Sequence, residues 1–104
     1  MGSLIYGHPS IDIKLEDRVL AHLQLVFSEK LRRNEGFHFS WADHELNGGW
    51  RNIVWVHPAM PLYFRYAGSR VPSLNQNWLG DMSRDINSNA GLILRDEPRE
   101  NGGS

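Results

Sequence analysis

The sequence predicts a single α+β domain whose elements follow one another as β-β-α-β-β-β-α-β. Three observations lead to this fold class: short apolar segments typical of strands, two longer stretches with apolar residues at helical spacing, and a length of 104 residues, which suits one domain. The sheet is expected to be mostly antiparallel, with both helices on one face. We assign residues 1–95 to this domain and residues 96–104 to a flexible polar tail.

The chain opens with a predicted β-hairpin. Two short apolar segments, residues 4–6 and 11–15, flank a quartet at residues 7–10 that contains glycine, proline and serine. These residue types are typical of tight turns, so the two segments should pair as antiparallel strands.

The first helix is predicted to begin near Arg18. Glu16 and Asp17 supply a plausible N-cap and negative charge at the positive end of the helix dipole. Basic residues in the last turn complement the other end of the dipole, and the glycine at position 36 ends the helix. One side of the helix is apolar, so it should lie on the sheet. That apolar stripe consists of Leu20, Leu23, Phe27 and Leu31, with Val19 and Val26 alongside.

The remaining elements are three strands, a second helix and a last short strand. The strands are predicted at residues 37–41, 51–57 and 62–67, and the first of them alternates aromatic with polar residues, which indicates one aromatic face. The second helix is expected to start with a capping box at Ser73–Gln76 and to carry apolar residues at four-residue steps. Residues 92–94 form the last strand.

Charge and composition exclude several classes of protein. Lysine and arginine number 11 against 12 acidic residues, a net charge of −1, so no global field favours nucleic acid or anionic lipid. The absence of cysteine excludes thiolate catalysis, disulfides and cysteine-ligated metals, and it suits a cytoplasmic protein. The first residues do not resemble a signal peptide or a membrane span, so we expect no membrane association.

The segment around Arg70 is the strongest candidate for a binding site. Arg70 lies just before the predicted start of the second helix, and helix N-termini with a nearby arginine attract phosphates and carboxylates. Ser69, Ser73 and Asn75 offer neutral hydrogen bonds, and Arg65 reaches the same place if its strand ends on that side. The alternative is that Ser73 only caps the helix while Arg70 pairs with a surface carboxylate.

A nucleic-acid surface is a related hypothesis. Arg32 and Arg33, at the end of the first helix, join the arginines of the anion site, and Trp50 is the aromatic residue expected to be exposed for stacking. The alternative is that Trp41 and Trp55 belong to the core and that the arginines only form a solvated face.

No catalytic or metal constellation stands out. His38, His44 and His57 with Asp43 have no spacing typical of a metal site, and no nucleophile elbow, phosphate-binding loop or dinucleotide fingerprint is present. We therefore assign no catalytic residue, metal or cofactor. A small-molecule enzyme with His57 or His44 as general base remains an alternative without a supporting constellation.

A set of short motifs runs through the chain from residue 4 to about residue 98. They are Leu4-Ile5-Tyr6-Gly7, Glu16-Asp17-Arg18-Val19-Leu20-Ala21-His22-Leu23, Lys30-Leu31-Arg32-Arg33, Phe39-Ser40-Trp41, Trp55-Val56-His57-Pro58 and Gly68-Ser69-Arg70-Val71-Pro72-Ser73-Leu74-Asn75.

Together these motifs resemble a family of small actinobacterial proteins, a domain of unknown function whose members are often labelled "ATP-dependent DNA ligase". A ligase needs a nucleophilic lysine in a Lys-x-Asp-Gly context and a much larger nucleotidyltransferase domain, and neither Lys14 nor Lys30 has that context. Autonomous ligation is therefore not expected, and the resemblance implies a link to DNA metabolism only through the label.

The sequence thus predicts a non-catalytic cytoplasmic binding module for nucleic acid or phosphate, possible partners being DNA or a protein of DNA metabolism. Its contact surface would combine the segment from Arg65 to Asn75 with Arg32 and Arg33. The alternative function is a structural or protein-interaction domain that forms a homodimer through an aromatic sheet face.

Overall fold

The structure, a computed structural model, describes residues 1–42 and 51–99. Two helices and six strands follow one another in the predicted order, which confirms the α+β class. The elements are β1 (Gly2–Tyr6), β2 (Ile11–Leu15), α1 (Asp17–Leu31), β3 (Phe37–Ala42), β4 (Arg51–Val56), β5 (Leu62–Arg65), α2 (Gln76–Ile86) and β6 (Leu92–Ile93).

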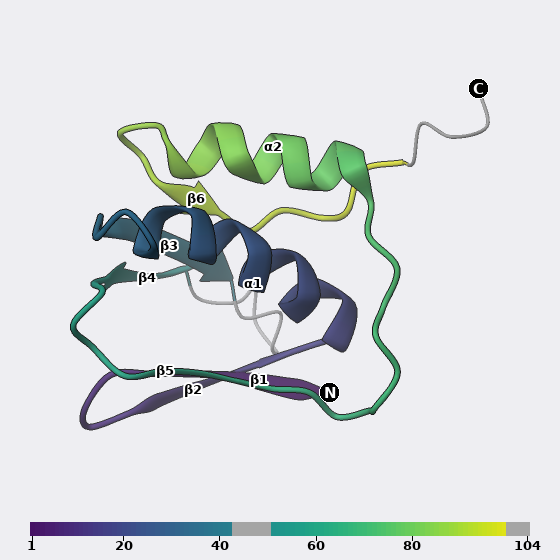
Figure 1. Cartoon of the computed structure of the whole chain (residues 1–104), viewed down its shortest axis with the longest axis horizontal. Coiled ribbons are helices and arrows are strands. Elements are labelled where there is room, and N and C mark those ends of the chain that lie inside the picture. Colours follow the sequence, from purple (N-terminus) through teal and green to yellow (C-terminus); the bar gives the residue numbers. More distant parts are fainter. Residues whose placement is uncertain (43–50, 100–104) are drawn as a thin grey trace.

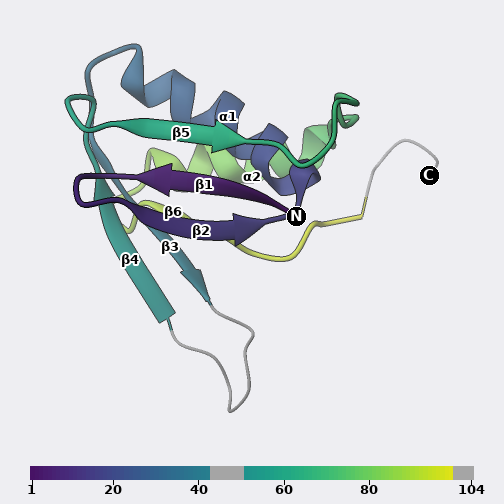
Figure 2. The same cartoon turned by 90° about the horizontal axis from the view of Figure 1, so that it is seen from below.

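The strands form two three-stranded sheets, where the sequence predicted one sheet. Sheet A has the order β2-β1-β5 and is antiparallel throughout. Sheet B has the order β4-β3-β6, in which β3 pairs antiparallel with β4 and parallel with β6. In the part of the chain that the structure describes, no strand of sheet A pairs with a strand of sheet B, and the two sheets run in clearly different directions (Figure 2).

Helix α1 joins the two sheets. It lies between sheet A and α2, and sheet B stands beside it (Figure 1). The ring of Phe27 on α1 meets Phe37 and Phe39 of β3 edge-on at centroid distances of 4.9 and 5.3 Å, and Phe64 of β5 at 5.9 Å. Such edge-to-face contacts stabilise aromatic clusters beyond the burial of their area. One side chain therefore packs against both sheets.

A second link between the sheets is polar. The Tyr6 hydroxyl at the end of β1 donates a hydrogen bond to the carbonyl of Trp55 (2.8 Å) and accepts one from the backbone N–H of His57 (2.9 Å). The Trp55 carbonyl lies on the edge of β4 that faces away from β3, and the His57 N–H directly follows the strand on the same side. The hydroxyl thus occupies the place that the backbone of a further strand would take.

Replacement of Phe27 by alanine should destabilise the fold by about 3–5 kcal/mol, because it opens a cavity at the point where α1 meets both sheets. The measurement is the free energy of unfolding in urea. The matched control is Leu25→Ala on the outer side of the same helix, where the side chain is 45% exposed and the expected cost is below about 1 kcal/mol. Equal losses in the two variants would contradict this role of Phe27.

Candidate functional site

The start of α2 differs from the predicted capping box. Asn75 is the N-cap: its backbone is extended, and its side-chain oxygen accepts hydrogen bonds from the backbone N–H groups of Asn77 (3.0 Å) and Trp78 (3.3 Å). The prediction that Ser73 caps the helix is therefore wrong. The physical reason is that α2 begins at Gln76, so the Ser73 side chain is too far from the first free N–H groups.

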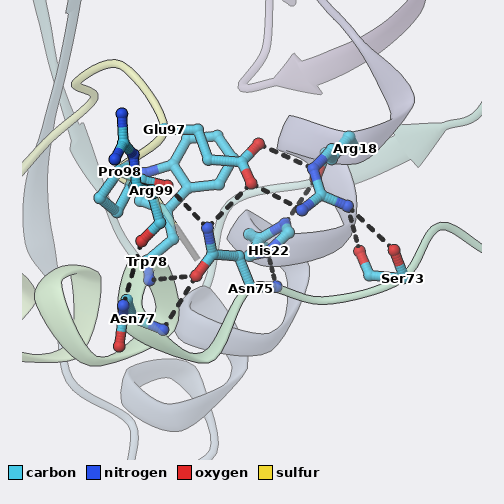
Figure 3. Close-up of polar contacts among 9 residues, drawn as sticks. All are labelled: Arg18, His22, Ser73, Asn75, Asn77, Trp78, Glu97, Pro98 and Arg99. Carbon is cyan, nitrogen blue, oxygen red and sulfur yellow. Dashed lines mark hydrogen bonds and ion pairs between the residues drawn. The ribbon is translucent and has the colours of Figure 1, made fainter. Parts of the chain in front are cut away.

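The chain's own C-terminal segment covers this helix start (Figure 3). The Asn75 amide nitrogen donates to the Glu97 carboxylate at 2.9 Å and to the Pro98 carbonyl at 2.8 Å. The Asn77 amide donates to the carbonyl of Arg99 at 3.1 Å. The sequence assigned these last three residues to a flexible tail, whereas each of them here is hydrogen-bonded to the start of α2.

Glu97 is also held by an arginine that the sequence did not single out. Nε and Nη2 of Arg18 donate to the two carboxylate oxygens at 2.7 and 2.6 Å, a bidentate pair, and Nη1 donates to the backbone carbonyl of Ser73 at 2.7 Å and to its hydroxyl at 3.1 Å. The hydrogen bond from Arg18, followed by that from Asn75, lowers the pKa of Glu97 from 4.5 to about 2. An anion therefore does lie beside the start of α2, and it belongs to the protein.

His22 on α1 fixes the position of the backbone at Asn75, the start of α2. It is fully buried and accepts the backbone N–H of Asn75 at Nε2 (2.8 Å), so Nδ1 carries the proton that it donates to the Arg18 carbonyl (2.7 Å). Its ring lies 4.7 Å from that of Trp78. Because its backbone partners are fixed in this way, His22 has a structural role.

A hollow of ≈ 400 Å³ lies next to this cluster, between the outer side of α1 and the loop that follows β5. Its volume falls within the range of small-ligand sites. Asp17, the first residue of α1, holds the loop in place by accepting the N–H groups of Ala67 and Gly68, both at 2.8 Å, and these two bonds lower its pKa. The hollow is lined by Ala21, Gln24, Leu25, Tyr66, Gly68, Ser69, Arg70, Val71, Pro72 and Leu74.

Two of the predicted site residues line this hollow, namely Ser69 and Arg70. Both side chains are exposed, and neither makes a hydrogen bond or ion pair with the residues that the structure describes. The expected alternative, an ion pair between Arg70 and a surface carboxylate, therefore does not form within residues 1–42 and 51–99. Around the arginine the wall is apolar, and Val71 is 86% exposed.

The comparisons with known proteins give a family. The family model described as a domain of unknown function (DUF7882) matches residues 1–97. The chain belongs to this family. No curated protein and no solved structure matches it significantly. The description of DUF7882 names neither a ligase activity nor a source organism, and the matched range ends at Glu97, the residue that Arg18 holds.

The remaining predicted site residues of this DUF7882 domain lie elsewhere. Arg32 and Arg33 follow the C-terminal end of α1, and the 15 residues of that helix place them about 22 Å from its start, where the Arg70 loop is anchored. Arg65 lies over the ring of Tyr63 on the outer face of sheet A, at 5.3 Å from the centroid. Trp50 lies outside the described residues. The fold therefore does not gather the predicted arginines on one surface.

The histidines of DUF7882 form no cluster in the described ranges. No group of three or more potential metal ligands occurs within residues 1–42 and 51–99, and His44 and Asp43 lie outside them. His57 uses Nδ1 to accept the backbone N–H of Ala59 at 3.1 Å. Neither of the two described helices is long and apolar enough to cross a bilayer.

Glu97→Gln should remove a pH-dependent part of the stability of this DUF7882 domain. The Glu97 carboxyl titrates near 4.5 when unpaired and at about 2 in the fold, so ionised Glu97 stabilises the folded state. This contribution, about 1 kcal/mol or less for a partly exposed pair, is complete above pH 4.5 and is lost as the pH falls towards 2. Thermal unfolding of both proteins from pH 7 to pH 2 measures it.

The two stability curves should be separated at neutral pH and converge in acid. Arg18→Gln, which removes the other partner of the ion pair, should likewise reduce the change in stability that the wild-type protein shows between pH 4.5 and pH 2. Curves that stay parallel down to pH 2 would show that the Arg18 and Glu97 pair contributes no pH-dependent stability.

Proposed function

We propose that the protein is a cytoplasmic, non-catalytic accessory of DNA metabolism that binds single-stranded nucleic acid, with one nucleotide unit seated in the Arg70 hollow. The single observation that carries this proposal is an exposed guanidinium, without a partner among the described residues, at the rim of an apolar hollow of ≈ 400 Å³.

The chemistry of the hollow matches the two parts of a nucleotide. Arg70 offers paired N–H donors and the Ser69 hydroxyl a further one, which suits the oxygens of a phosphate. The walls formed by Leu25, Val71 and Leu74 are apolar and suit the face of a base. Contacts of this kind recognise the backbone and the stacked base and do not read the sequence.

The lining of the hollow favours binding over catalysis. It contains no histidine, aspartate, glutamate or lysine among the described residues, and the hydroxyl of Tyr66, which also lines it, donates to the Gln24 side chain at 2.7 Å. The carboxylate of Asp17, which contacts Gly68 in the lining, is engaged by two backbone N–H groups.

The proposal narrows the set of residues expected to bind. Arg70 and Ser69 remain, whereas Asn75 caps α2 and Ser73 accepts hydrogen bonds from Arg18. Because Arg33 lies at the far end of α1, it serves as a charge-matched control in the experiment below.

Arg70→Glu should weaken binding of a labelled single-stranded oligonucleotide by about tenfold or more at low salt, because it removes the phosphate contact and adds repulsion. Fluorescence anisotropy measures this affinity. Arg33→Glu, which changes the net charge equally, should leave the affinity within about twofold.

Since one arginine makes the phosphate contact, the dependence of log affinity on log salt should be shallow, with a slope of about −0.7. Equal losses in the two variants would indicate a diffuse electrostatic effect and would contradict a site at Arg70. Binding of duplex and single strand with equal affinity would exclude the insertion of a base.

A second candidate function, homodimerisation, is favoured by the outer face of sheet B. The aromatic residues Phe37 and Phe39 of β3 are buried in the core, so they cannot form the contact face. On the opposite face, however, Ile53 and Trp55 of β4 are 53% and 50% exposed. Trp55 packs against His38 of β3, with the rings 4.9 Å apart.

If this face forms a dimer, Trp55→Ser should lower the weight-average mass measured by sedimentation at high protein concentration, because the exposed ring contributes most of the apolar contact. The control is Tyr63→Ser, which removes an aromatic ring that is 55% exposed on the outer face of sheet A. A wild-type protein that sediments as a monomer at all concentrations would eliminate this candidate.

A further inference from the structure

A groove of ≈ 1060 Å³ opens between the two sheets, and it shares no lining residue with the Arg70 hollow. One wall is β2 of sheet A, and the other is the part of β4 from Asn52 to Val54. The sheets are joined by Tyr6 at one corner and diverge from there (Figure 2). The groove is therefore the open part of the space between their inner faces.

Both walls are edge strands. β2 is the outermost strand of sheet A, and β4 is the outermost strand of sheet B. Because backbone groups alternate along a strand, the use of Trp55 and His57 by Tyr6 means that Ile53 presents its own N–H and C=O on the same outer edge of β4. No backbone hydrogen bond reaches this edge of Ile53 from the described residues.

The Tyr6 hydroxyl makes the same hydrogen bonds to this edge that a neighbouring strand would make. It donates to the Trp55 carbonyl on β4 and accepts from the N–H of His57, directly after β4, as the backbone of a neighbouring strand does. Past Tyr6 the same pattern of donors and acceptors continues into the groove at Ile53, where an added strand would complete it.

The floor of the groove is apolar. On the sheet A side it contains Ile13 and Leu15, and on the sheet B side Trp41 and Val54, all from inner faces of the sheets. Of these residues only Ile13 is buried, at 6% exposure, so the others retain apolar surface that the fold leaves partly accessible. A strand lying in the groove would turn every second side chain towards this floor.

The charges at the rim favour a basic occupant. Each lysine and arginine that lines the groove already has an acidic partner: Lys14 pairs with Asp12 at 3.2 Å, Arg18 with Glu97 at 2.6 Å and Arg95 with Asp85 at 3.5 Å. Two exposed carboxylates of the groove have no ion-pair partner among the described residues, and these are Glu16 and Asp96.

From this geometry we propose that the groove binds an extended polypeptide segment of a partner protein. The segment pairs with the outer edge of β4 at Ile53, places apolar side chains at alternate positions on the floor, and carries lysine or arginine that meets Glu16 and Asp96. Because β2 has 5 residues and β4 has 6, the segment spans about six residues. This proposal uses none of the residues of the Arg70 hollow, so its test is independent of the test of nucleotide binding there.

The test is an NMR titration of the ¹⁵N-labelled full chain with a synthetic peptide in which valine alternates with lysine and threonine. Saturable shifts confined to the amides of β2 and of residues 52–54 are expected at up to millimolar peptide. The matched control is the same peptide N-methylated at every second residue, which keeps charge and side chains but removes the edge hydrogen bonds. It should bind about tenfold more weakly or not at all.

Two variants of the protein test the separate parts of the proposal. Ile53→Pro removes an N–H that faces the groove and not β3, so the ladder to β3 is kept while peptide binding is lost. Asp96→Lys should weaken binding several-fold, whereas Asp81→Lys on α2, with the same change in net charge, should not. The charge variants keep the test valid if the proline variant fails to fold.

Three results of these experiments would overturn the proposal. Equal binding of the N-methylated peptide would show that no strand is added. The absence of shifts at millimolar peptide would show that the groove does not take an extended segment. Shifts of the same amides on dilution of the protein alone would assign the groove to a second copy of the chain.

Discussion

The packing of Phe27 against both sheets is the contact on which the rest of the fold depends. Within the described residues the two sheets share no backbone ladder, so their relation is set by side chains. Phe27 supplies the apolar contact to β3 and β5, and the Tyr6 hydroxyl supplies a polar one to β4. The Arg70 hollow lies on the outer side of the helix that carries Phe27, and the groove opens where neither contact holds the sheets together.

The pair of Arg18 and Glu97 connects residues 79 positions apart in the sequence and ties the end of the described chain to the start of α1. Through Ser73 and Asn75 the same pair also positions the start of α2. This cluster places a carboxylate of the protein itself, that of Glu97, beside the helix start at which the anion site was predicted. Arg70, in the loop before this helix, makes no ion pair with the described residues.

The order and type of the elements could be read from the sequence because they follow from local patterns of apolar spacing and turn residues. The division into two sheets could not, because it depends on β1 pairing with β5 and β3 with β6, contacts between distant segments. The cap of α2 was misplaced by two residues because Ser73 and Asn75 are equally good caps by type. The sequence did contain one signal for the cluster of Arg18, Asn75 and Glu97. His22 lies among the apolar residues of α1, and a buried polar residue needs hydrogen-bond partners.

The corner contact of Tyr6 has a consequence for how this architecture tolerates change. A phenol ring and one hydroxyl set the distance between the two sheets at that corner, and the rings around Phe27 set it along the helix. Exchange of a single ring would alter the angle between the sheets while every ladder within them stays intact. Substitutions at a few side chains can therefore change the distance between the two sheets while the strand order within each sheet stays the same.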